Sequence, residues 1–172
     1  MSFYRNRRPQ AHGEEPEKCA DAAKARARAL DALSAREMTS AQLYEKLCGS
    51  FTEQAAAAAV AEMVELDYVN DERYAEARAH GLLMARKSRR AAAQNLRQKG
   101  LNSRQIEQAL ETVYAPDADG ENPELEAASA LVNSRYRRKL AEGRRDLVVA
   151  ALLRRGFAYP VVREAIRRAE EA

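Results

Sequence analysis

A turn that occurs twice constrains the fold of this chain more than any other feature of its sequence. LRQKGL at residues 96–101 and LLRRGF at residues 152–157 share a leucine, a base, a glycine and a large apolar residue, 56 positions apart. Glycine at such a point is typical of a left-handed residue that ends a helix, with the next apolar residue packing over the turn. Apolar residues at helical spacing follow both copies. Each copy therefore predicts two helices joined by a glycine turn. In the first third of the chain Leu47 aligns with Leu96, but Phe51 falls where the glycine should be.

Helix-start signals divide the chain into three groups of three helices. Thr39-Ser40-Ala41-Gln42 has the form of a capping box, and Asn122-Pro123 places a capping residue before a proline in a first turn. Modules of this size are too small for a full core, so they should stack on one another. The expected fold is all-α, with three tandem three-helix modules forming an elongated, curved repeat array. The predicted divisions are a disordered segment at 1–18, modules at 19–67 and 68–114, an acidic linker at 115–123 and a module at 124–172.

The apolar residues of two helices predict which of their faces are buried. For a helix over 21–35, the shared face carries Ala23, Ala27 and Leu30. For the first helix of the second module, the predicted core residues are Tyr74, Ala77, Gly81 and Met84. We expect Asp71 to cap that helix. Helix capping, together with the interaction of acidic residues with the N-terminal helix dipole, explains the adjacent carboxylates of Asp71 and Glu72 better than a catalytic role does.

Composition and motif spacing argue against several classes of function. No apolar stretch approaches the roughly 18 residues that cross a bilayer, and the N-terminal arginines precede no apolar segment, so we expect a cytoplasmic protein with no membrane partner. The two cysteines and two histidines show no metal-ligand spacing. The glycines form no phosphate-binding loop, and no nucleophile stands beside a base and an orienting acid. We therefore expect a protein that is not an enzyme and needs no cofactor or metal.

Positive charge is concentrated in the second and third modules. Residues 68–114 carry nine bases against five acids, and 124–172 carry eleven against seven, whereas 19–67 carry five against eight. This asymmetry is typical of a surface that faces a polyanion or an acidic protein, although a solvated helix face is the alternative for any single arginine. Arginine suits phosphates and carboxylates equally. The candidate partner-binding residues are Arg86, Lys87, Arg89, Arg90, Arg97, Lys99, Arg135, Arg138, Arg145, Arg154 and Arg155.

Three segments resemble motifs of a known family. DYVNDERY at residues 67–74 resembles the G-Y-L-D-D-x-R-F signature of the RecX regulatory proteins, which Asp71, Arg73 and Tyr74 match and from which Asp67 and Asn70 depart. RKSRR at 86–90 followed by LRQKGL, which contains Gly100, is similar to the second-module pattern of that family. SAQLYEKL at 40–47 resembles its first-module pattern, and the likeness extends over about residues 20–172.

The resemblance implies a function and a partner. RecX-like proteins are expected to bind, as monomers and without a cofactor, along the groove of the RecA filament on single-stranded DNA. The implied consequences are a block of filament extension and inhibition of strand exchange, ATP hydrolysis and co-protease activity. Two alternatives stay open: a helical protein that binds nucleic acid directly through its basic second and third modules, with at least weak affinity for free DNA, and a helical scaffold for another protein.

Overall fold

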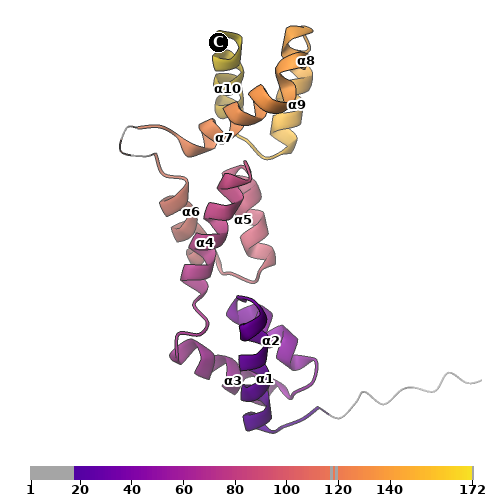
Figure 1. Ribbon diagram of the computed structural model, residues 1–172, viewed down its shortest axis with the longest axis vertical. Helices are drawn as coiled ribbons and strands as arrows, with labels where there is room; N and C mark the ends of the chain where they lie inside the picture. Colours follow the sequence, from indigo (N-terminus) through magenta and orange to yellow (C-terminus); the bar gives the residue numbers. More distant parts are fainter. Residues whose placement is uncertain (1–17, 117, 119, 172) are drawn as a thin grey trace, which may run out of the picture.

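The structure is a computed structural model that describes residues 18–116, 118 and 120–171. The segment predicted to be disordered lies outside this range except for Lys18, as do Asp117 and Asp119 of the predicted acidic linker. In the described residues the regular elements are helices, and the one extended pairing is an isolated bridge between Cys19 and Phe51. Figure 1 shows three groups of helices stacked in chain order along the long axis, which confirms the elongated array of three-helix modules.

The first module packs α1 (Ala22–Ala35), α2 (Ser40–Cys48) and α3 (Glu53–Glu65) around Leu43, Leu47 and Met63. The capping box is confirmed, because the Gln42 N–H donates to the Thr39 hydroxyl and the Gln42 side chain accepts from the Thr39 N–H. The predicted face of α1 is wrong. Its buried residues are Ala25, Ala29 and Ala32, which let α1 approach its neighbours closely.

The second module consists of α4 (Asp71–Met84), α5 (Arg89–Gln98) and α6 (Ser103–Val113). Of the residues predicted for the core face of α4, Tyr74 packs against the core, but Ala77, Gly81 and Met84 are exposed. The buried residues of this helix are instead Ala75, Ala79 and Leu82. The predicted cap is displaced by one residue. Asn70 caps α4 by accepting from the Arg73 N–H, so the carboxylate of Asp71 is available to another helix.

The third module begins with an interrupted helix. Here α7 (Pro123–Leu131) runs through a π-helical turn, η1 (Val132–Tyr136), into the short α8 (Arg137–Ala141). The helices α9 (Arg145–Arg154) and α10 (Tyr159–Glu171) complete a core around Val132, Val148, Leu152 and Ile166. The predicted cap at Asn122 with Pro123 behind it is confirmed. No helix of the described residues is both long and apolar enough to cross a bilayer.

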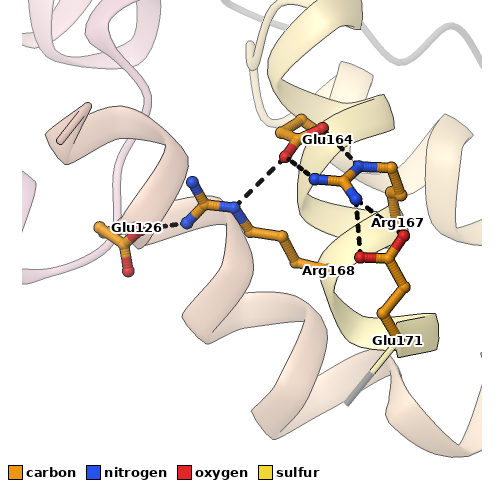
Figure 2. A network of polar contacts seen from close by, with 5 residues as sticks. All are labelled: Glu126, Glu164, Arg167, Arg168 and Glu171. Atoms are coloured by element: carbon orange, nitrogen blue, oxygen red, sulfur yellow. Dashed lines mark hydrogen bonds and ion pairs between the residues drawn. The ribbon is translucent and has the colours of Figure 1, made fainter. Parts of the chain in front are cut away.

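The exposed side of α10 carries an ion-pair network that reaches α7 (Figure 2). Arg168 pairs with Glu126 of α7 at 2.6 Å, and Glu164 accepts hydrogen bonds from Arg167 and Arg168. These two guanidinium groups lower the pKa of Glu164 to about 2, the hydrogen bond from Arg167 being the largest cause. The arginines of α10 in this network are therefore neutralised within the module.

The two glycine turns have the predicted conformation. Gly100 has φ +83° and Gly156 has φ +90°, a region in which a Cβ is strained. The apolar residues behind them, Leu101 and Phe157, are buried in the cores of their modules. The repeat in the sequence is therefore a repeat in the structure.

Candidate functional site

The second helices of the three modules, α2, α5 and α9, meet end to end. The end of α5 lies against the start of α2, which we term the 1–2 joint, and the end of α9 lies against the start of α5, which we term the 2–3 joint. At each joint the partly negative C-terminus of one helix faces the partly positive N-terminus of another. The joints therefore decide which side chains of neighbouring modules come together.

At the 2–3 joint a buried serine connects the two helices. The Ser88 hydroxyl accepts from the Ala91 N–H at 3.2 Å, which caps α5, and donates to the Arg155 carbonyl at 2.8 Å. The Arg89 N–H donates to the Glu124 carboxylate at 2.9 Å. Burial raises the pKa of Glu124, against the opposing effects of the hydrogen bond and charge of Arg89. A half-buried carboxylate therefore faces the N-terminal end of α5.

Cations from two modules gather at this joint. Arg89 and Arg90 start α5, and Arg154 and Arg155 end α9. A Cβ built on Gly156 would lie 3.4 Å from the Cβ of Arg90, so the backbones approach closely. With the two cations of the preceding turn, this group forms what we term the joint patch: Arg86, Lys87, Arg89, Arg90, Arg154 and Arg155.

Some cations of the joint patch are held by intramolecular contacts. Arg86 donates to Ser134 of the third module at 2.9 Å, Arg89 forms an ion pair with Glu107 at 2.9 Å, and Arg155 donates to the Tyr136 hydroxyl at 3.2 Å. Arg90 and Arg154 are exposed, and among the described residues neither forms an ion pair or a side-chain hydrogen bond. These two guanidinium groups are therefore free to bind an anionic group of a partner.

A groove of about 530 Å³ lies beside the patch. Ala93, Leu110 and Ala158 contribute its apolar lining, Arg89 and Arg90 contribute cations, and Glu107 and Glu124 contribute two carboxylates. An arginine beside an apolar surface can bind a carboxylate or phosphate while adjacent apolar groups are removed from water. The arrangement is suited to binding and contains no group placed to act as a nucleophile.

The other candidate cations lie elsewhere. Arg97 and Lys99 are near the 1–2 joint, where the Lys99 carbonyl accepts from the Thr39 hydroxyl at 2.6 Å. Arg135 lies in η1 and Arg138 in α8, where Arg138 pairs with Glu142. Arg145 starts α9 and pairs with Glu170, so it is at the opposite end of that helix from Arg154. The structure thus brings together six of the eleven candidates.

The signature residues lie at the start of α4 rather than in the joint patch. Asp71 accepts from the Ser40 N–H at 2.8 Å and from the Ser40 hydroxyl at 2.6 Å, which connects the second module to the first. Arg73 pairs with Asp67 at 2.9 Å, and the Arg73 and Asn70 contacts lower the pKa of Asp67. Tyr74 packs against the second core, and Gly100 lies at the 1–2 joint.

Sequence reasoning missed Thr39, Ser88 and Glu124 as residues that connect modules. A signal was present, because Thr39 and Ser88 stand 49 positions apart, the same offset that aligns Leu47 with Leu96. A hydroxyl before a helix predicts a cap, however, and only the structure shows that the same hydroxyl has a second partner in another module.

The fold and the joints define a class of modular, all-helical binding proteins. Residues 70–110 match the family model described as RecX, second three-helix domain. The chain is 34% identical over 102 residues to the regulatory protein RecX of Caldanaerobacter subterraneus subsp. tengcongensis, a match that covers 59% of this chain and 52% of that protein. The chain therefore spans about half the length of this curated relative.

Solved structures extend the likeness over most of the chain. A crystal structure of RecX from Lactobacillus salivarius superposes with a TM-score of 0.77 at 21% identity, covering 88% of this chain and 97% of that one. A second crystal structure, of a regulatory protein RecX, gives a TM-score of 0.73 at 26% identity, covering 86% and 71%. The chain is therefore similar to RecX proteins in sequence over its second module and in fold over most of its length.

Proposed function

We propose that this protein is a negative regulator of a RecA recombinase. In this proposal it binds the RecA filament on single-stranded DNA, blocks filament extension and inhibits strand exchange, ATP hydrolysis and co-protease activity. The observation that carries the proposal is the similarity to RecX proteins, in the family model over residues 70–110 and in a curated relative named as a regulatory protein. The elongated shape adds support, because a rod of stacked modules can follow a filament over several subunits.

The joint patch is the surface that we assign to this binding. Arg90 and Arg154 come from different modules, are exposed and form no ion pair among the described residues. Charges of this kind at the edge of an interface mainly raise the rate of association and fix its register. The Arg167–Arg168 network of α10 is a weaker candidate, because its charge is compensated within the third module.

The test is a double charge reversal, Arg90→Glu with Arg154→Glu, assayed for inhibition of RecA ATPase on single-stranded DNA. Neither side chain is in an ion pair with another described residue, so helical content and melting should stay close to those of the unmodified protein. We expect the half-inhibitory concentration to rise by about tenfold, most clearly at low salt where long-range attraction is strongest.

The matched control is Arg36→Glu with Lys46→Glu in the first module, which changes the net charge equally. Both control residues are exposed, and neither is in an ion pair of the described residues. We expect inhibition by the control to change by no more than about twofold. Equal losses in the two variants would mean that net charge matters and the joint patch does not.

Direct nucleic-acid binding is the second candidate, favoured by Arg90 and Arg154, whose side chains have no ion pair with another described residue. Guanidinium groups bind phosphates as readily as carboxylates. Fluorescence anisotropy on naked single-stranded DNA at several salt concentrations separates the two candidates. For a direct binder, a plot of log affinity against log salt concentration should have a slope of about −0.7 per phosphate contacted. The double variant Arg90→Glu with Arg154→Glu should make that slope shallower, because fewer phosphates are contacted. A filament regulator should bind the RecA filament far more tightly than naked DNA.

A further inference from the structure

The two joints are built from the same contacts. At the 1–2 joint the fully buried Thr39 hydroxyl accepts from the Gln42 N–H at 3.2 Å and donates to the Lys99 carbonyl at 2.6 Å. At the 2–3 joint Ser88, also fully buried, forms the same two bonds with Ala91 and Arg155. Each hydroxyl therefore forms a hydrogen bond with an N–H at the start of its own helix and with a carbonyl at the end of a helix in the next module.

A carboxylate from the next module completes each joint. The N–H of the residue after the hydroxyl, Ser40 or Arg89, donates to a carboxylate in the first turn of the next module. That carboxylate belongs to Asp71 at the 1–2 joint and to Glu124 at the 2–3 joint. An N–H at the start of a helix has no partner inside the helix, so this bond satisfies a group that would otherwise need water.

A glycine permits the close approach at each joint. A Cβ on Gly100 would overlap the Cβ of Ala41, and a Cβ on Gly156 would lie 2.7 Å from the Ser88 hydroxyl oxygen. The glycines that end α5 and α9 therefore serve the contact between modules as well as the turn. A hydroxyl has one donor and two acceptor positions, which is what a bridge between an N–H and a carbonyl requires.

The two ends of the array lack half of this joint. In the third module Arg144 stands 56 positions after Ser88, and the start of α9 has no side-chain cap. In the first module Phe51 stands 49 positions before Gly100. In the described residues, the hydroxyl and the glycine thus occur together at the two joints between modules.

We infer that Thr39 and Ser88 are joint hydroxyls, positioning residues that lock each module onto the next and fix how the three described modules are stacked. At the aligned position of the third module, Arg144 offers no hydroxyl for such a contact. The joint also brings Arg90 close to the end of α9, which carries Arg154, so the joint patch exists only while the 2–3 joint is closed. The inference on the joints stands independently of the proposed function.

Amide exchange measured by NMR on the full chain tests this inference, with Ser88→Asp as the decisive variant. An aspartate caps a helix by accepting from the Ala91 N–H but has no hydrogen to donate to the Arg155 carbonyl. The Arg89 amide donates to Glu124 of the next module and therefore reports the joint. We expect its exchange to accelerate by about fivefold, because that factor corresponds to the loss of one net hydrogen bond. Exchange of the Ala91 amide, which reports the cap, should stay within about twofold of the unmodified protein.

Two further variants bracket this result. Ser88→Thr keeps both bonds and should leave both amides protected, whereas Ser88→Ala should accelerate both. Thr39→Asp at the 1–2 joint should accelerate the Ser40 amide and spare that of Gln42. An Arg89 amide that exchanges equally in Ser88→Asp and in the unmodified protein would overturn the inference. Accelerated exchange of Ala91 in Ser88→Asp would overturn it as well, because faster exchange at Arg89 would then follow from a lost helix cap and not from a lost bond between modules.

Discussion

The 1–2 joint and the 2–3 joint share their backbone chemistry but differ in the side chains around it. Both have a buried hydroxyl, a carboxylate from the next module and a glycine in left-handed conformation. At the start of α2 the residues after the hydroxyl are Ser40 and Ala41, whereas at the start of α5 they are Arg89 and Arg90. The contact between modules is thus independent of the charge carried beside it.

The comparison separates what stacks the modules from what can bind a partner. The small Ala41 lies where Gly100 approaches, and the side chain of Ser40 is directed to Asp71. At the 2–3 joint the corresponding positions carry guanidinium groups, and a further contact from Arg86 to Ser134 braces the two modules. A repeated joint can therefore carry a binding surface at one of its two copies.

The largest expected effect is that of adding a side chain to the joint glycines. Gly100→Val and Gly156→Val each force a β-branched residue into left-handed backbone and into contact with the preceding module. Strain of about 1–3 kcal/mol and overpacking of about 1–3 kcal/mol should add in the free energy of unfolding. The loss should be larger at Gly100, because the Cβ of Ala41 cannot rotate away as the Ser88 hydroxyl can.

Thermal unfolding followed by circular dichroism measures this difference. Phe51→Leu is the control at the aligned position of the first module, where no left-handed glycine is present, and it should destabilise less than either valine. Unchanged melting in both glycine variants would show that the two positions tolerate a side chain and that the joints are looser than described.

A smaller effect is expected from single reversals on α5. Arg90 and Arg97 are both exposed, and neither is in an ion pair of the described residues, but Arg90 lies at the 2–3 joint and Arg97 near the 1–2 joint. We expect Arg90→Glu to weaken inhibition of RecA ATPase by about threefold to fivefold and Arg97→Glu by less than about twofold. If Arg97→Glu has the larger effect, the binding surface is centred on the 1–2 joint instead.

The sequence predicted the repeated turns, several caps and the all-helical class, because these depend on local residue types. It failed for the buried faces of α1 and α4, where alanines occur on several sides of the helix. Packing then favours the small residues Ala25 and Ala75, which permit close helix contacts, over larger ones such as Met84. The π-helical turn at Val132–Tyr136 left no sequence signal, because it arises from the backbone of a continuous helix.

The candidate cations were predicted as a list but not as a surface. Charge counts identified Arg89, Arg90 and Arg154, yet they could not show that α9 ends where α5 begins. They also could not separate Arg145, which pairs with Glu170, from Arg154, which is in no ion pair of the described residues. Both distinctions depend on contacts between modules, which a residue list does not contain.

The smallest expected effect distinguishes the carboxylates of the two joints. Burial raises the pKa of Glu124, so the folded protein binds that proton more tightly than the unfolded chain does. The contribution of Glu124 to the free energy of unfolding should therefore increase as the pH falls from neutral through its raised pKa. Glu124→Gln keeps an oxygen that can accept from the Arg89 N–H but removes the charge, so at neutral pH it should melt no lower than the unmodified protein.

The measurement is the difference in melting temperature between the unmodified protein and Glu124→Gln from pH 7 to pH 4.5. We expect the melting temperature of the unmodified protein to rise relative to that of the variant as the pH falls. The Glu124 carboxylate then takes up a proton, and the cost of its buried charge disappears. Asp71→Asn at the 1–2 joint is the comparison. Asp71 accepts two bonds from Ser40, and loss of its charge should weaken both, so this variant should melt lower at neutral pH. A lower melting temperature for Glu124→Gln at neutral pH would instead mean that the charge of Glu124 at the start of α5 outweighs its burial.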